Sequence, residues 1–287
     1  MKSAFFPFVI FLGLFLGATS CKSDATSMRK SIAVSLPPHA AILNEITCDS
    51  IDVVTLMHSN ANPESFEVTV NDIRAVSDAD AYIKAGNLHF EQSLTQRISQ
   101  SNPDLLFVDA SEGIDLIYGT HSHGNHVHSV ADPHTWTSVP NIKIIAANML
   151  AVVIDVDPAN EGFYTSNYNR LVARLDSIDC VLSSKLNKVD SKAFLIWHPS
   201  LSYFARDYGL SQIAIGQDNK EMTPGQIRDT HNNAVEAGVK VMFIQQNFDA
   251  RQAENIAKEL GIDIVQINPL DSDFIHQFII LADALSQ

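Results

Sequence analysis

Short apolar runs alternate with longer segments of helical periodicity in the first half of the chain. The apolar runs predict strands at 31–36, 52–57, 81–84 and 105–108, and the segments with apolar residues three or four positions apart predict helices at 39–47, 71–78 and 88–99. Strands separated by helices favour a parallel sheet covered on both faces. We therefore predict an N-terminal α/β lobe over residues 31–140.

The same alternation returns near the C-terminus and predicts a second lobe over residues 190–287. Its strands are expected at 193–197, 211–215, 241–244 and 263–267, and its helices at 203–208, 224–237, 250–260 and 274–285. The expected fold class is α/β, with two lobes that are each a parallel sheet flanked by helices. This arrangement places a ligand site in the cleft between the lobes, near the carboxyl ends of the strands.

A long helical pattern separates the two lobes. Residues 141–189 have apolar positions at helical spacing, interrupted near Asp157 and Pro158. A helix of about 28 residues would extend roughly 42 Å, which is long enough to reach from one lobe to the other. We therefore expect one long, rigid connecting helix.

The N-terminus has the order of a secretory signal peptide. Lys2 precedes an apolar run at 4–16, and small residues stand directly before Cys21. The small residues resemble a bacterial lipobox, in which Cys21 is acylated and becomes the mature N-terminus, with plain secretion as the alternative. We predict a lipoprotein signal peptide over 1–20 and a polar tether over 21–30. The body is then a bacterial lipoprotein of the cell envelope, facing the periplasm or the outer membrane.

Charge and cysteine content narrow the possible partners. The formal net charge of −14 repels phosphate backbones, so nucleic acid is not expected as a partner, whereas a cationic ligand is compatible with it. Cys48 and Cys180 have no thiolate metal spacing around them. A disulfide between them is permitted outside the cytoplasm, but we favour two buried, free thiols.

Four side chains that can bind metal follow predicted strands, where the cleft is expected. Two imidazoles and two carboxylates suit a divalent ion, as a tetrahedral zinc site or as a manganese site with additional oxygen ligands. A single histidine after a strand is more often structural, so the spacing alone is weak evidence. The candidates are Glu64, His134, His198 and Asp271.

Two of these histidines lie in segments that resemble a known family. Asp132-Pro-His-Thr-Trp136 is similar to the Asp-Pro-His-x-Trp motif of the zinc/manganese ABC-transporter substrate-binding proteins, and 198–210 resembles their second-lobe segment His-x-x-x-x-Tyr-Phe-x-x-x-Tyr-Gly-Leu. Further similar segments are Met222-Thr-Pro-Gly225, 243–248 and Asn268-Pro-Leu270. The resemblance runs from about residue 31 to the C-terminus. It implies one metal ion held between two lobes and delivered to an ABC-transporter membrane permease.

The resemblance also assigns roles to single residues. His134 and His198 match family ligands, Glu64 stands where the family usually has histidine, and Asp271 resembles the fourth position. A carboxylate at position 64 hardens the site and makes the preference for zinc over manganese less certain. Where the family often has glutamate after the strand at 241–244, this chain has Gln245-Gln246, and we interpret Gln246 as a residue behind the ligands or a structural one.

Two polar residues near these motifs have competing interpretations. Asp132 either accepts a hydrogen bond from the His134 ring or caps a following helix, and the sequence does not separate the two. His39, after two prolines, is expected at the surface rather than on the rim of the cleft.

The segment 119–130 is rich in histidine and lacks apolar periodicity, so we predict an irregular surface loop. Neutral imidazoles on such a loop can collect zinc weakly and supply a tighter site. Because manganese binds imidazole poorly, this loop favours zinc over manganese. A solvated loop without a metal role is the alternative. The histidines concerned are His121, His123, His126 and His128.

Three classes of function fit a metal-binding protein of the cell envelope. Metal capture for an ABC importer needs a binding protein, expected to be monomeric, that performs no catalysis. A zinc hydrolase needs an open coordination position and a general base, and the chain lacks the His-Glu-x-x-His and Gly-x-Ser-x-Gly motifs. No sequence feature marks an adhesin surface. We therefore favour zinc capture, with manganese as the closest alternative.

Overall fold

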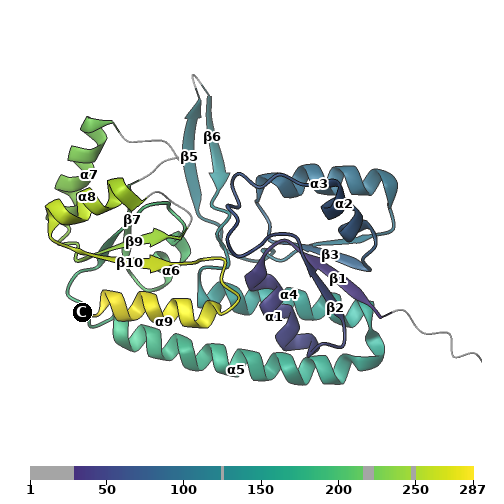
Figure 1. Ribbon diagram of the computed structural model, residues 1–287. Coiled ribbons are helices and arrows are strands. Elements are labelled where there is room, and N and C mark those ends of the chain that lie inside the picture. Colours follow the sequence, from purple (N-terminus) through teal and green to yellow (C-terminus); the bar gives the residue numbers. More distant parts are fainter. Residues whose placement is uncertain (1–28, 124–125, 216–222, 247–249) are drawn as a thin grey trace, which may run out of the picture.

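Two parallel four-stranded sheets form the two ends of an elongated molecule (Figure 1). The first sheet has the order β2-β1-β3-β4 and the second the order β10-β9-β7-β8. When the second is read from the opposite edge, as β8-β7-β9-β10, the two sheets have the same topology. The strands are β1 (Ser31–Val34), β2 (Asp52–Thr55), β3 (Ala81–Lys84), β4 (Leu106–Asp109), β7 (Ala193–Ile196), β8 (Ser211–Ala214), β9 (Val241–Gln245) and β10 (Asp263–Ile267).

Helices alternate with these strands as the apolar pattern predicted, which confirms the α/β class with two flanked parallel sheets. The helices are α1 (Pro37–Thr47), α2 (Val70–Ser77), α3 (His89–Ser101), α4 (Val139–Val156), α5 (Glu161–Leu186), α6 (Ser202–Asp207), α7 (Pro224–Glu236), α8 (Ala250–Leu260) and α9 (Phe274–Leu285). This computed structural model describes residues 29–123, 126–215, 223–246 and 250–287. The predicted signal peptide and Cys21 lie outside the described residues.

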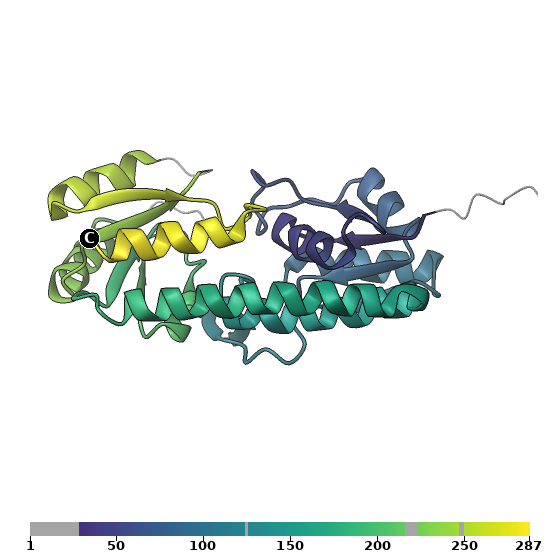
Figure 2. The same cartoon turned by 90° about the horizontal axis from the view of Figure 1, so that it is seen from below.

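One long helix, α5, joins the two sheets as predicted, and a second helix, α4, packs against it. The chain turns at the short 3-10 helix η1 (Pro158–Asn160), and α5 then runs back along α4. Asp157 and Pro158 end the first helix because proline removes a backbone donor and disfavours helical backbone before it. With 26 residues, α5 is about 39 Å long and passes beneath both sheets, against α1 and α9 (Figure 2).

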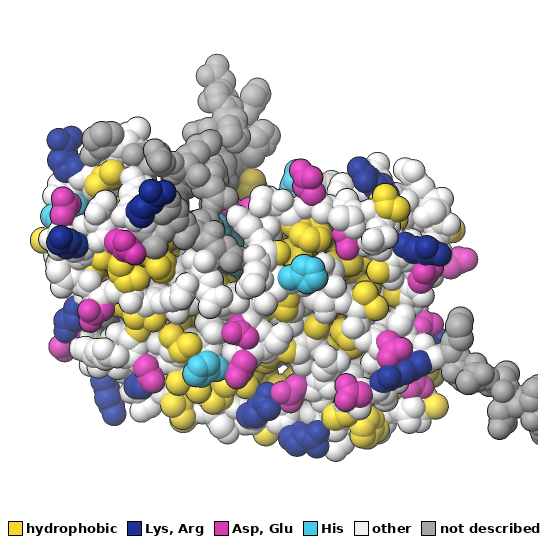
Figure 3. Space-filling model, viewed as in Figure 1, with side chains coloured by type: hydrophobic (Ala, Val, Ile, Leu, Met, Phe, Trp, Pro, Cys, Tyr) yellow, Lys and Arg dark blue, Asp and Glu magenta, His cyan; other side chains and the backbone are white. Residues whose placement is uncertain are grey.

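The helix α4 is apolar enough over its 18 residues to cross a membrane by length and composition. It contacts α1 and α5, however, and eight of its residues are buried in the protein core. Burial inside the fold accounts for this apolar character. Charged side chains of both signs are interspersed along the lower edge of the molecule in Figure 3. Ion pairs join α5 to its neighbours, among them Arg174 with Glu45 and Lys185 with Asp283.

One continuous apolar core extends through both halves of the molecule, and a smaller cluster covers the outer face of the second sheet. Strand β7 contributes to both, because Phe194 and Ile196 join the main core while Ala193 and Leu195 join the smaller cluster. Its loop at the carboxyl end is therefore attached to a strand fixed on both faces.

The histidine-rich segment is a β-hairpin, so the prediction of an irregular loop is wrong. Strands β5 (Tyr118–His123) and β6 (His126–Ala131) pair antiparallel, with His121 opposite His128 and His123 opposite His126. Because strand positions alternate between faces, these four positions share one face of the ladder. The side chains at 120–129 lie outside the described part of the structure.

Two smaller expectations also need correction. His39 is fully buried in the first turn of α1, with its ring edge-on to Trp136, because that turn packs between the first sheet and the connecting segment. Cys48 and Cys180 are free, as favoured, but both are exposed rather than buried.

Candidate metal site

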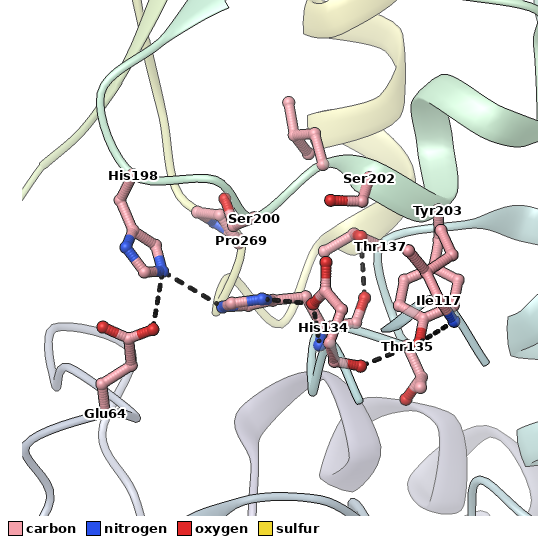
Figure 4. Close-up of polar contacts among 12 residues, drawn as sticks. Glu64, Ile117, His134, Thr135, Thr137, His198, Ser200, Ser202, Tyr203 and Pro269 are labelled. Carbon is pink, nitrogen blue, oxygen red and sulfur yellow. Dashed lines mark hydrogen bonds and ion pairs between the residues drawn. The ribbon is translucent and has the colours of Figure 1, made fainter. Parts of the chain in front are cut away.

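Three side chains from separate parts of the chain converge between the two sheets (Figure 4). The Nε2 atoms of His134 and His198 are 3.3 Å apart, and Nε2 of His198 lies 3.4 Å from Oε1 of Glu64. One ligand atom from each residue lies within 4.8 Å of the other two. Glu64 lies between β2 and α2, His134 between β6 and α4, and His198 between β7 and α6, so the site joins both halves of the chain.

The His134 imidazole is held in one orientation by Asp132. Its Nδ1 lies 2.8 Å from Oδ1 of Asp132, and the same oxygen accepts the backbone N–H of His134 at 2.9 Å. An Nδ1–H donated to a carboxylate leaves the lone pair of Nε2 directed away from it, toward His198. Helix α4 begins at Val139 with Ser138 as its cap, so the ring contact is the observed role of Asp132 and the helix cap is not.

His198 follows β7 directly, at the carboxyl end of the second sheet. Its backbone is fixed by Gln245, the last residue of β9, and this contact is not predicted by local sequence patterns. Gln246 is exposed and lines a small cavity of about 40 Å³ beside the two histidines. Strand alternation is the signal that separates them, because it directs neighbouring side chains to opposite faces.

Glu64 is the most exposed of the three groups, with 36% of its side chain accessible. It lies in an irregular segment between β2 and α2, where the Asn62 side chain accepts the Glu64 backbone N–H at 3.0 Å. The turn built by Asn62 directs this segment toward the second half of the chain.

Burial and the neighbouring His134 ring lower the pKa of His198 to about 3. Removal from water disfavours the charged imidazolium, and a second imidazole at 3.3 Å adds to this effect. His198 is therefore neutral at physiological pH, which is the form that binds metal ions.

Asp271 lies outside this cluster of three. It is in the turn before α9, where its carboxylate accepts the backbone N–H of Asp273 at 2.9 Å and the side-chain amide of Gln277 at 3.2 Å. These hydrogen bonds give the Asp271 carboxylate a structural role in the turn that begins α9. Of the four predicted ligands, the structure brings together three.

A groove of about 680 Å³ opens on the cluster from the side of the hairpin. All three groups line it, together with Gly119 and Val130 at the base of β5 and β6. The histidine-bearing hairpin therefore rises from the rim of the same groove that leads to Glu64, His134 and His198.

The separations within the cluster suit a zinc ion. Zinc binds imidazole nitrogen at about 2.0–2.1 Å, so two ligands in a tetrahedral shell lie roughly 3.3 Å apart. The observed separations of 3.3 and 3.4 Å match this value. Two nitrogens and one carboxylate oxygen form a donor set that zinc uses, and manganese accepts the same set with more oxygen ligands.

Comparison with known proteins shows the family of this chain. The family model described as zinc-uptake complex component A, periplasmic (ZnuA) matches residues 32–278. The chain belongs to this family. The prediction of a metal-binding component of an ABC uptake system, made from the two histidine segments, is thereby confirmed.

Relatives within the family differ in the metal that they are named for. The chain is 27% identical to the high-affinity zinc uptake system protein ZnuA of Bacillus subtilis, over 88% of this chain and 82% of that protein. It is also 27% identical to the manganese ABC transporter substrate-binding lipoprotein PsaA of Streptococcus anginosus, over 89% and 86%. A crystal structure of ZnuA superposes with a TM-score of 0.79 at 28% identity, covering 90% of this chain and 98% of that one.

Proposed function

We propose that this chain captures zinc outside the cytoplasm through Glu64, His134 and His198 and delivers it to the membrane permease of an ABC importer. The observation that carries this proposal is the separation of 3.3 Å between the two imidazole nitrogens, because two ligands of one tetrahedral zinc ion lie about this far apart. Manganese is the alternative cargo, supported by the carboxylate of Glu64 and by the manganese relatives.

Capture and release follow from where the three groups lie. Because the ligands come from both halves of the chain, a bound ion links the halves, and release requires Glu64 or His198 to withdraw. The groove beside the hairpin is the route of entry, and the histidines of β5 and β6 collect zinc weakly ahead of the tight site. This is binding without turnover, as expected of the substrate-binding component of a transporter.

The remaining parts of the proposal concern the membrane. Acylation of Cys21 tethers the protein, as a monomer, to the membrane next to its permease. A Cys21→Ala variant is expected to leave the membrane fraction and appear as soluble protein. Recovery of this variant in the membrane fraction would contradict the lipid anchor.

Calorimetric titration of the metal-free protein with zinc tests the function. Wild-type protein is expected to bind one zinc tightly, and His198→Ala to lose about 100-fold or more in affinity, because a ligand is removed. The matched control is His276→Ala, which removes an exposed imidazole on α9. Equal zinc affinity in wild type and His198→Ala would overturn the proposal.

A further inference from the structure

Two glutamine side chains contact the two ends of the loop that carries His198. Strand β7 lies between β9 and β8 in the second sheet, and each of these neighbours provides one glutamine, Gln245 from β9 and Gln212 from β8. Both side chains reach the loop that runs from His198 to Ser202.

Gln245 contacts the beginning of this loop through three hydrogen bonds. Its Oε1 accepts the backbone N–H of His198 at 3.3 Å, and its Nε2 donates to the carbonyl of His198 and to Oγ of Ser200, each at 2.8 Å. Gln245 and Ser200 are both buried. The opposite amide orientation would set Oε1 against the carbonyl oxygen, so this pattern requires a group that both donates and accepts.

Gln212 contacts the end of the same loop. Its Oε1 accepts the backbone N–H of Leu201 at 2.7 Å, and its Nε2 donates to Oγ of Ser202 at 3.0 Å. Ser202 begins helix α6, so this glutamine fixes the point at which the loop enters the helix. One glutamine therefore contacts the backbone of His198 directly, and the other holds the opposite end of the same loop.

We propose that Gln245 and Gln212 are positioning residues that hold the His198 loop at both ends and so set Nε2 of His198 at the separation from Nε2 of His134 that a zinc ion needs. This inference rests on the proposed function, since it concerns the same metal site. Groups behind metal ligands that fix the ligand geometry affect metal affinity by about 10–100-fold. Glutamate is the informative replacement, because it keeps the size of the side chain and removes both donors.

The experiment compares Gln245→Glu and Gln212→Glu with Gln266→Glu, the same change at an exposed position on β10. Zinc affinity is measured on folded, metal-free protein by competition with a chromophoric chelator. The visible absorption spectrum of the cobalt(II) form reports the coordination geometry, and the melting temperature of the metal-free form reports folding. A purely structural role lowers only the melting temperature.

We expect Gln245→Glu and Gln212→Glu each to lose about 10–100-fold in zinc affinity and to change the cobalt spectrum, with Gln266→Glu unchanged in both. If a glutamate variant does not fold, Gln245→Met or Gln212→Met removes the same hydrogen bonds without adding charge. Wild-type affinity and cobalt spectrum in the folded variants would overturn this inference while leaving the proposed function intact. Failure of wild-type protein itself to bind zinc would overturn the proposed function.

Discussion

The Nε2 atoms of His134 and His198 lie 3.3 Å apart, although 64 positions separate the two residues in the sequence. His134 is oriented by Asp132 from the connecting segment, and His198 by the carboxyl end of β7. The third group, Glu64, is the least buried and the only carboxylate of the three. Glu64 is therefore the position at which the choice of metal is most easily changed.

Replacing Glu64 with histidine is expected to shift the site toward zinc. A third imidazole softens the donor set, so the ratio of zinc to manganese affinity should rise by about tenfold. Competition titrations with both metals measure this ratio. Glu67→His, which alters an exposed residue nearby, serves as the control, and an unchanged ratio in Glu64→His would show that Glu64 does not contact the ion.

The buried His39 should make the protein less stable in acid. Burial lowers the pKa of His39 to about 4, whereas the unfolded chain takes up this proton near the ordinary value of 6.5. Between these two pH values only the unfolded state is protonated, so the free energy of unfolding falls by about 3 kcal/mol as the pH drops from 6.5 to 4. Urea unfolding across this range should show a smaller fall in His39→Phe and the full fall in His276→Phe. Parallel profiles for His39→Phe and wild type would contradict the assignment.

The buried Glu91 should make the protein less stable as the pH rises, which is opposite to the effect of His39. It accepts hydrogen bonds from Ser35 and from the backbone N–H groups of Ala85 and Gly86, and burial raises its pKa to about 7 from an ordinary value of 4.5. The folded state then holds a proton that the unfolded state has released, so the free energy of unfolding falls by about 3 kcal/mol as the pH rises from 4.5 to 7.

The test of this effect is Glu91→Gln, compared with the exposed control Glu112→Gln. A neutral amide has no proton to release, so the stability of Glu91→Gln relative to wild type should improve steadily as the pH rises through this range. Unfolding in urea at several pH values gives the difference. A constant difference would mean that the Glu91 carboxyl titrates equally in both states.

The hairpin should hold zinc independently of the tight site. Changing His121, His123, His126 and His128 together to asparagine removes imidazoles that alternate along both strands, and a titration should then show fewer weak zinc sites. The tight site should keep its affinity, because its three groups lie elsewhere. A large loss of tight binding in this variant would make the hairpin part of the primary site.

Much of the fold followed from the spacing of apolar residues. Four predicted segments coincide with observed elements: 81–84 with β3, 250–260 with α8, 263–267 with β10 and 274–285 with α9. Buried strands and amphipathic helices each require a characteristic spacing of apolar residues, which can be seen in the sequence. The hairpin was missed because its strands are polar, although Gly124-Asn125 between them is a dipeptide typical of two-residue turns. The interruption at Pro158 was visible in the sequence, but the reversal of the chain there was not, because it depends on packing of α5 against α4.

The site was predictable where a motif carried it. His134 and His198 were found from their segments, and Glu64 from its place in the chain. Asp271 lies outside the cluster of three, in a turn before α9, and its role as a ligand stays a prediction. The burial of His39 depends on Trp136, and the role of Gln245 depends on its contacts with His198. Both partners are distant in sequence, so local sequence patterns do not predict these contacts.

Anomalous X-ray diffraction at the zinc absorption edge, on crystals grown with one equivalent of zinc, tests the central claim most directly. The account predicts one dominant peak within bonding distance of Nε2 of His134, Nε2 of His198 and the carboxylate of Glu64. A dominant peak at any other place, or no peak between these three groups, would contradict it.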